Sequence, residues 1–406
     1  MLSVWAALPF IALLVAIGVL PVTRYRWWER YFPLVALVST LPVIFGYLAF
    51  RQSLAPVQHT IREYFSFICL IGSLYIIAGG IRLRIVGPPK PLYNVLMLLA
   101  GALISNIIGT TGASMLLIRP FLNINRHRMA PYLVVFFIFI VANIGGAMTP
   151  IGDPPLFLGY VNGVPFFWLA GRVWFVWLVT LGIVLAAFYW LDRRNQACRS
   201  TTSRRMVIHL EGWRNLALLA VILVAVFAHT PVRELIMVGA ALASYVFTSE
   251  ELHRRNRFSF GPIREVSILF AAIFVTMAPV LELLEQNAAR LHLRTSLSFF
   301  WGTGLLSGFL DNAPTYRTFF QVALSLCGGD VNSLLQLSPD FVVAVSLGAV
   351  FFGAFSYIGN GPNFMIKSIA EHRRFQVPHF FSYITHYSIP ILLPTFVVVS
   401  LLLLIL

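Results

Sequence analysis

Two twelve-residue stretches of this sequence are alike: GAMTPIGDPPLF at 146–157 and GAFSYIGNGPNF at 353–364. Gly, Ala, Ile, Gly, Pro and Phe occupy the same six positions in both, and Asp153 of the first stretch corresponds to its amide analogue Asn360 in the second. Gly and Pro interrupt helices, because Gly adopts unusual backbone angles and Pro lacks an N–H donor. The match predicts two copies of one unit, in which a helix ends in the same irregular turn.

An apolar stretch broken by polar residues precedes each copy. Residues 91–118 are broken by SNIIGTTG at 105–112, and residues 296–327 are broken by DNAPT at 311–315. A helix that faces lipid does not tolerate such a break, because no water is present to bond the freed backbone groups. We therefore expect each stretch to be a re-entrant hairpin that enters the membrane and returns to the same side.

The breaks lie at matching distances from the repeated stretches. Asn106 is 40 residues before Gly146. Asn312 is 41 residues before Gly353. This spacing indicates that the broken hairpin belongs to the repeated unit.

Composition decides the class of protein. The 406 residues are 59% hydrophobic and 11% charged, with a mean hydropathy of +0.83, which argues against a water-soluble enzyme. The formal charge of +14 lies in short loops between apolar segments, so it is a topology signal and no nucleic-acid partner is expected. Hydropathy predicts an all-α polytopic membrane protein whose partner is the lipid bilayer. About ten transmembrane helices are expected, near 3–21, 32–50, 64–81, 131–150, 167–190, 215–230, 233–248, 265–284, 339–358 and 381–405.

The basic residues orient the chain. With the N- and C-termini outside and both hairpins re-entrant, 22 of the 29 Lys and Arg residues lie inside, as the positive-inside rule requires. The two repeats then have inverted topology. The expected organisation is an N-terminal half at 1–190 with hairpin 91–118 and broken helix 131–160, a basic cytoplasmic linker at 191–214, and a C-terminal half at 215–406 with hairpin 296–327 and broken helix 339–366.

Inverted repeats with broken helices are typical of secondary transporters that bind a small ion at the membrane midplane. Asp153 and Asp311 lie at the polar breaks, and a carboxylate at membrane depth is by default a functional-site hypothesis. Each Asp either exchanges a proton for a cation or caps a half-helix, and the two roles are compatible. His386, in the last span, either relays protons or bonds within the bundle.

The predicted ion- or substrate-binding residues are those with small or polar groups at the four breaks. They are Ser105, Asn106, Thr110, Thr111, Asn143, Thr149, Gly152, Asp153, Asp311, Asn312, Thr315, Ser356, Gly359, Asn360 and Asn363. Carboxylate and amide oxygens suit a hard cation, and the predicted Na⁺ ligands are Asn106, Asp153, Asp311, Asn312 and Asn360. No catalytic residue and no cofactor are expected beyond Na⁺ and H⁺ as transported or coupling ions.

The chain resembles the ion transporter superfamily, in the branch of citrate transporters and NhaD-type sodium/proton antiporters. The resemblance lies in NIGGAMTPIGDPPLFLG at 143–159, FLDNAPTY at 309–316 and YIGNGPNFMIKSIAE at 357–371, and it covers roughly residues 60–400. It implies a homodimer, with a scaffold part, a mobile part that holds both hairpin tips, and elevator-like alternating access. It also implies a bacterial inner membrane.

The hairpin tips depart from the dicarboxylate symporters that the chain resembles. Those carry Ser-Asn-Thr at both tips, whereas this chain has Ser-Asn-Ile at 105–107 and Asp-Asn-Ala at 311–313. An Asp repels a carboxylate substrate but suits a site where H⁺ and Na⁺ compete. The leading hypothesis is therefore sodium/proton antiport. The alternative is Na⁺- or H⁺-coupled transport of a small anion such as citrate, a dicarboxylate or an oxyanion.

An enzyme, the third class considered, is not expected. An intramembrane aspartyl protease would use two acids as a dyad, but neither Ile-Gly-Asp-Pro around Asp153 nor Phe-Leu-Asp-Asn around Asp311 matches the motifs of such proteases. The sequence also contains no HExxH and no GxSxG.

Overall fold

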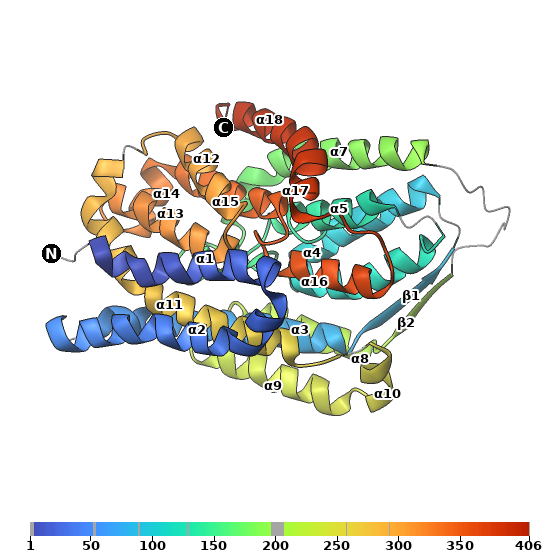
Figure 1. Cartoon of the computed structure of the whole chain (residues 1–406), viewed down its shortest axis with the longest axis horizontal. Helices are drawn as coiled ribbons and strands as arrows, with labels where there is room; N and C mark the ends of the chain where they lie inside the picture. The colour runs from blue at the N-terminus through green and yellow to red at the C-terminus, as the bar shows by residue number, and fades with distance from the viewer. Residues whose placement is uncertain are drawn as a thin grey trace.

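The chain folds into a helical bundle with one short ribbon of two strands (Figure 1). The computed structural model describes residues 4–51, 54–87, 90–127, 130–195, 207–256, 258–291 and 293–405. The α-helices and strands are α1 (Leu8–Thr23), α2 (Tyr25–Gly46), α3 (Ala55–Gly79), β1 (Arg82–Val86), α4 (Pro91–Ile124), α5 (Pro131–Ile140), α6 (Pro154–Val161), α7 (Trp168–Arg194), β2 (Val207–Glu211), α8 (Arg214–Ala225), α9 (Val232–Phe247), α10 (Glu250–Arg255), α11 (Gly261–Asn287), α12 (Ser296–Ser307), α13 (Asn312–Leu326), α14 (Val331–Leu337), α15 (Pro339–Phe352), α16 (Gly361–His372), α17 (Phe380–Tyr383) and α18 (Leu393–Leu403). Shorter 3₁₀ or π turns are η1 (Val4–Ala7), η2 (Tyr47–Arg51), η3 (Ile144–Gly146), η4 (Ala288–Leu291), η5 (Gly353–Phe355) and η6 (Ile384–Leu392).

The helices confirm the all-α membrane fold. Among the described residues, six helical segments are long and apolar enough to cross a bilayer. A pair of helices bent by 99°, Val331–Leu337 with Pro339–Phe355, raises the number to seven only if the pair forms one span. Shorter apolar helices at Trp5–Pro21, Pro131–Gly146 and Arg214–Ala225 coincide with further predicted spans. The total of ten crossings stays a prediction.

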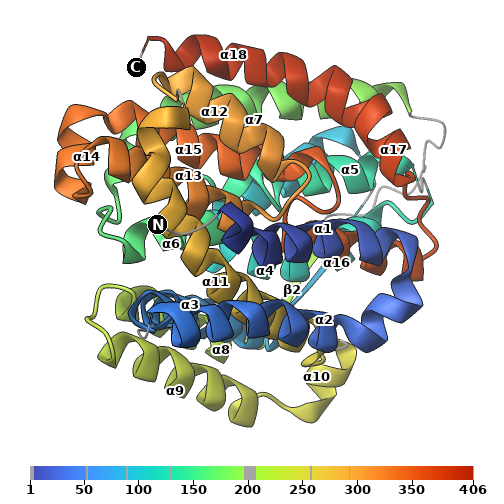
Figure 2. The same ribbon diagram turned by 60° about the vertical axis from the view of Figure 1, so that its left-hand side comes forward.

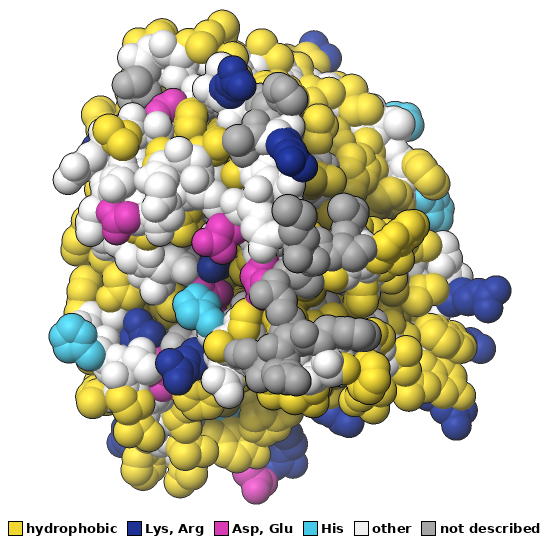
Figure 3. Space-filling view, turned by 90° about the vertical axis from the view of Figure 1, so that its left-hand side faces the viewer, with side chains coloured by type: hydrophobic (Ala, Val, Ile, Leu, Met, Phe, Trp, Pro, Cys, Tyr) yellow, Lys and Arg dark blue, Asp and Glu magenta, His cyan; other side chains and the backbone are white. Residues whose placement is uncertain are grey.

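The outer surface is suited to lipid. On α2, an apolar face of Leu34, Leu37, Val38, Leu41 and Phe45 is between 54% and 68% exposed. In Figure 3 acidic side chains gather on the end face, basic and His side chains lie both on that face and at its rim, and apolar side chains cover much of the remaining surface. An apolar exterior with charges at the ends is the pattern of a bilayer-spanning bundle.

Both stretches expected to form hairpins are interrupted near the middle. Gly109 divides α4, because its φ of 77° lies in the left-handed region that glycine tolerates. The two arms then run back along each other, so that Asn94 and Asn125 exchange hydrogen bonds of 2.9 and 2.8 Å at the base. The second hairpin consists of α12 and α13, which are separated by residues 308–311. How deep each hairpin enters the membrane stays a prediction.

The helix that follows each of these stretches is interrupted by an irregular turn. The first runs through α5 and η3, and α6 follows an irregular turn at 147–153. The second runs through α15 and η5 to α16 in the same way. The helices α5 and α15 are apolar on all sides, and residues 133–140 are at most 1% exposed. They form the centre of the core, and their broken ends therefore lie inside the protein.

The helices separate into two groups (Figure 2). One group contains α2, α3, α8, α9 and α11, and the other contains both hairpins, both broken helices, α7 and α18. A buried ion pair crosses the boundary, with the Arg317 guanidinium of α13 at 3.2 Å from the Glu63 carboxylate of α3. Removing either partner from such a buried pair leaves an uncompensated charge, so this contact couples the two groups.

A two-stranded antiparallel ribbon, which the sequence analysis did not anticipate, lies at one end of the bundle. It pairs β1 with β2, from Arg82 opposite Glu211 to Val86 opposite Val207. The strand β2 falls within the predicted basic linker at 191–214. Residues 196–206 of that linker lie outside the described residues.

Candidate functional site

Asp153 is the centre of a buried polar cluster at the four breaks. Its side chain is 0% exposed. Its carboxylate accepts hydrogen bonds from the Thr110 hydroxyl at 2.7 Å, the Asn312 amide at 2.6 Å and the Asn360 amide at 3.0 Å. These donors come from the first hairpin, the second hairpin and the second broken helix. The site is therefore assembled from both repeats.

The residues that follow Asp153 direct its side chain into this cluster. An Asp that begins a helix normally accepts bonds from the backbone amides of the first turn. Here Pro154 and Pro155 occupy the first two helical positions and have no N–H. Asp153 accordingly makes no capping bond to α6, and its carboxylate is available to the neighbouring tips.

Matching backbone hydrogen bonds link each hairpin to its broken helix. The Thr110 N–H donates to the Gly152 carbonyl at 2.7 Å. The Asn312 N–H donates to the Gly359 carbonyl at 3.1 Å. Because Gly152 and Gly359 are aligned in the repeat, Thr110 is the counterpart of Asn312. The predicted correspondence of Asn106 with Asn312 is therefore wrong by four residues.

The repeated glycines are required by close backbone approach. A Cβ on Gly152 would lie 2.1 Å from the Gly146 carbonyl oxygen. A Cβ on Gly359 would lie 2.7 Å from the Gly353 oxygen and 2.6 Å from the Ser307 oxygen. Real side chains do not approach backbone this closely, so both turns exclude any larger residue.

Asparagine side chains continue the cluster away from Asp153. The Asn360 amide also donates to the Asn143 side-chain oxygen at 3.1 Å. The Asn143 amide donates to Asn363 at 2.8 Å, and the Asn363 amide donates to the Gly353 and Ser356 carbonyls at 2.7 and 2.9 Å. All three Asn side chains are at most 2% exposed. This chain of bonds holds the two broken helices together at their breaks.

Asp311 has a different position. Its carboxylate accepts a hydrogen bond of 3.0 Å from the Ala313 N–H and so caps α13. The Thr315 hydroxyl donates to the Asp311 carbonyl oxygen at 2.8 Å. No hydrogen bond described in the structure joins Asp311 to Asp153. The capping role is therefore observed for Asp311 and is absent at Asp153.

The remaining predicted residues mainly bond the backbone around the breaks. The hydroxyl of Ser105 donates to Val141 at 2.7 Å, and the side chain of Asn106 bonds Gly145 and Met148 at 2.6 and 3.0 Å. Thr149 donates to the Asn106 carbonyl at 2.6 Å, and the Ser356 hydroxyl accepts from Gly359 at 3.3 Å. His386 is exposed, and its bonds are to Ser382 and Thr385 of its own segment.

A small cavity of about 20 Å³ lies against Asp153. Thr110, Thr111, Gly152 and the apolar side chain of Leu74 are among the residues that line it. This volume is near that of a single water-sized sphere. The cavity is therefore matched to a water molecule or a bare ion.

Asn312 supplies a further oxygen at the cluster. Its side-chain Oδ1 is buried and has no hydrogen-bond partner among the described residues. Buried amide oxygens are normally satisfied. The two ends of an amide differ in chemistry, since Nδ2 donates to a carboxylate whereas Oδ1 accepts protons or binds a cation. Rotation of the Asn312 amide would thus exchange a donor for an oxygen ligand beside Asp153.

A comparison with known families identifies the class of this protein. A family model described as "Putative citrate transport" matches residues 1–404. The chain belongs to this citrate-transport family. It is a secondary transporter and a multi-pass membrane protein, and the resemblance to the citrate-transporter branch is confirmed. Membership of a transport family also disfavours the protease hypothesis. No curated protein matches the chain.

The sequence analysis did not anticipate several buried charged residues, among them the ion pair on the boundary between the helix groups. Arg317 and Glu63 are each 4% exposed as an ion pair, and Arg317 also donates to Gln321 at 2.8 Å. The span expected at 64–81 begins one residue after Glu63. The helix begins at Ala55 with Pro56 in its first turn, and Pro is favoured at that position. This signal would have placed Glu63 inside the helix.

Proposed function

We propose that this transporter is a sodium/proton antiporter in which Asp153 alternately holds a proton and a cation. The observation that supports the proposal best is the environment of Asp153, a buried carboxylate whose three side-chain partners are a hydroxyl and two amides. These neutral partners leave its charge uncompensated. A proton or a small cation supplies the missing positive charge.

The size and the donor set of the site also favour a small ion. The cavity of about 20 Å³ beside Asp153 accepts a water-sized species, and the Asn312 oxygen is the kind of ligand that a hard cation prefers. Bound Na⁺ would take the carboxylate and amide oxygens. Protonation of Asp153 would instead release the cation, because the carboxyl group would then be neutral.

Transport requires that the site open to each side in turn. We propose elevator-like movement of the helix group that holds Asp153 along the group containing α3 and α11. The Glu63–Arg317 ion pair lies on that boundary and is expected to rearrange during the movement. A bacterial inner membrane with both termini outside is part of this proposal.

The second candidate function is transport of citrate coupled to H⁺ or Na⁺, with Asp153 as the coupling group. The description of the matching family favours it. In this candidate the half-helix N-termini at α13 and α16 would bind substrate carboxylates. The cavity beside Asp153 has to widen before citrate fits.

Proteoliposomes with an imposed pH gradient separate the two functions. A pH-sensitive dye reports proton movement after addition of Na⁺, Li⁺ or K⁺, and labelled citrate reports anion uptake. Antiport predicts that Na⁺ or Li⁺ dissipates the gradient without citrate. Citrate transport predicts that citrate accumulates in proportion to the gradient. If the pH gradient does not change when Na⁺, Li⁺ or K⁺ is added without citrate, the antiport proposal is wrong.

Two substitutions test the role of Asp153. Asp153→Asn is expected to abolish coupled transport, because an amide does not exchange a proton for a cation. Asp330→Asn is the matched control: Asp330 is an exposed cap of α14, bonded to the Ser333 N–H at 2.8 Å. If Asp153→Asn transports like wild type, Asp153 is not the coupling group.

A further inference from the structure

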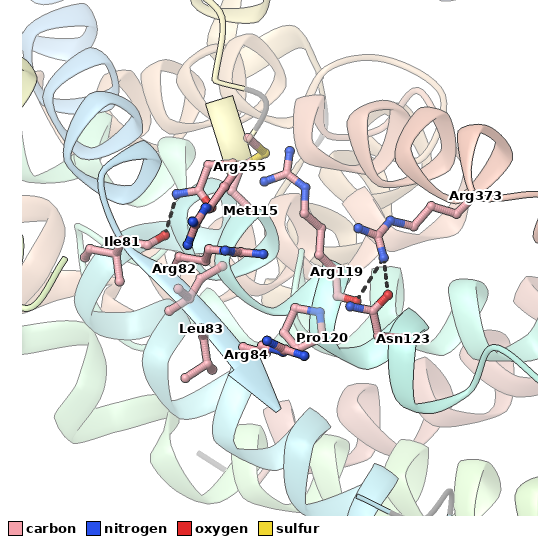
Figure 4. A pocket seen from close by; sticks show the side chains of 12 residues that line it. Ile81, Arg82, Leu83, Arg84, Met115, Arg119, Pro120, Asn123, Arg255 and Arg373 are labelled. Atoms are coloured by element: carbon pink, nitrogen blue, oxygen red, sulfur yellow. Dashed lines mark hydrogen bonds between the residues drawn. The ribbon is translucent and has the colours of Figure 1, made fainter. Parts of the chain in front are cut away.

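Five arginine side chains line one pocket at the end of the molecule that carries the ribbon (Figure 4). They are Arg82 and Arg84 of β1, Arg119 of α4, Arg255 of α10 and Arg373, which follows α16. The pocket has a volume of about 90 Å³, which is room for a group of several heavy atoms. It is separate from the cluster around Asp153, with which it shares no lining residue.

Acidic side chains balance only part of this charge. Glu211 lies 3.5 Å from Arg82 and 3.7 Å from Arg255. Glu251 lies 2.7 Å from Arg255. Five guanidinium groups and two carboxylates leave three positive charges in excess. The residues outside the described ranges contain no Asp or Glu, so no acidic side chain from them reduces the excess.

The two hydrogen bonds described for Arg373 in the pocket are to neutral groups. Arg373 donates to the Asn123 side-chain oxygen and to the Arg119 carbonyl oxygen, the latter at 3.5 Å. Topology alone explains basic residues on the inner side of a membrane protein. It does not explain their convergence from four elements onto one pocket, because like charges that gather in a hollow repel one another.

We propose that this pocket binds a phosphate-bearing anion. Guanidinium groups form paired, charge-assisted hydrogen bonds with phosphate oxygens, and such a ligand would neutralise the excess charge. The phosphate comes either from an anionic phospholipid or from a soluble phosphate compound. Ile208 and Leu210 of the neighbouring strand β2 are 59% and 45% exposed, which favours a lipid headgroup at the membrane surface.

The pocket lies between the two helix groups, so a bound ligand is expected to affect the stability of the fold. Arg255 belongs to a helix between α9 and α11, whereas Arg119 and Arg373 belong to the group that contains the hairpins. A phosphate that contacts both sides would join the two groups. Because a ligand that binds only the folded state stabilises it, bound phosphate is expected to raise the unfolding temperature.

The test uses the purified full chain, first delipidated in neutral detergent. Unfolding temperature is measured against inorganic phosphate and pyrophosphate at constant ionic strength. A second arm uses nanodiscs of phosphatidylcholine with or without cardiolipin, and native mass spectrometry counts retained lipid. Stabilisation by soluble phosphate supports a soluble ligand, and selective retention of cardiolipin supports a lipid headgroup.

Variants assign the effect to the pocket. Arg119→Gln with Arg373→Gln is expected to weaken binding about tenfold or more, because each guanidinium makes charge-assisted bonds. If the double variant does not fold, phosphate binding is measured instead with Arg84→Gln, a substitution at an exposed strand position. The matched control is Arg290→Gln with Arg294→Gln, two exposed arginines outside the pocket. Equal binding by pocket and control variants overturns the proposal, as does the absence of any response to phosphate, pyrophosphate and cardiolipin.

Discussion

The two repeats place different chemistry at the same structural positions. The turn after the first broken helix carries Asp153, and the turn after the second carries Asn360. The hairpin tips carry Thr110 and Asn312, whose N–H groups make corresponding bonds to Gly152 and Gly359. The backbone bonds are shared, whereas of the two aligned turns only the first carries a charged residue.

This difference shows how two aligned turns supply one carboxylate and one amide to the same cluster. Two carboxylates at the aligned positions would repel each other at short range, since Asn360 lies 3.0 Å from Asp153. An amide at the second position instead donates to the carboxylate. The duplicated turn thus supplies a ligand in one repeat and its hydrogen-bond donor in the other.

Moving the charge between the repeats should have the largest effect. Asp153→Asn combined with Asn360→Asp transfers the carboxylate to the second repeat and keeps a donor opposite it. We expect transport to recover to a measurable fraction of wild type, whereas Asp153→Asn alone has none. Ion-driven flux in proteoliposomes provides the measurement. No difference between the double and single variants would show that the position of the charge, and not only its presence, is essential.

Removing the buried ion pair should have the next largest effect. The offset that matches Thr110 to Asn312 also matches Met115 to Arg317, so only the second hairpin carries a charge there. Arg317→Met is expected to cost about 3–5 kcal/mol of unfolding free energy, because it leaves Glu63 buried and unpaired. Adding Glu63→Gln should restore part of the loss. Denaturant titration of purified protein measures both, and additive losses would contradict the pairing.

The two glycine turns should differ in their tolerance of a methyl group. Gly152→Ala places Cβ 2.1 Å from a carbonyl oxygen, closer than the 2.6 Å found for Gly359→Ala. We expect both to destabilise the protein by about 1–3 kcal/mol, with Gly152→Ala the more severe. Thermal unfolding in detergent gives the comparison. Gly171→Ala, which meets no atom within 4 Å, is the control and should be close to neutral.

Substitutions at the two hairpin tips, Thr110 and Asn312, should have the smallest effects on transport. Thr110→Val removes one hydroxyl donor to Asp153 and is expected to weaken the apparent affinity for the coupling ion about tenfold. Asn312→Ala removes a donor and a buried oxygen, so its effect should be greater. The concentration of cation or proton that gives half-maximal flux reports both. Equal effects would exclude the Asn312 oxygen as a ligand.

Much of this architecture follows from hydropathy and from the repeated stretch. Apolar runs located the helices, and Gly109 and Pro154 marked breaks that the structure contains. The correspondence between the hairpin tips could not be predicted from the sequence, because Ser105-Asn106 and Asp311-Asn312 look alike. Only the backbone hydrogen bonds show that Thr110 corresponds to Asn312. The ribbon had a signal in the alternation of Arg82, Leu83, Arg84 and Ile85, which is the period of a strand.

The ribbon also limits how far the two helix groups can travel. Eleven residues connect Gly79 at the end of α3 to Pro91 at the start of α4, and five of them are the extended strand β1. A strand is already nearly fully extended, at about 3.3 Å per residue. The five residues of β1 therefore cannot lengthen further. Its partner β2 leads into α8, which belongs to the same helix group as α3. The paired strands therefore connect that group to α4. A large displacement of α4 relative to α3 would therefore require either that the six other connecting residues extend or that the two strands separate.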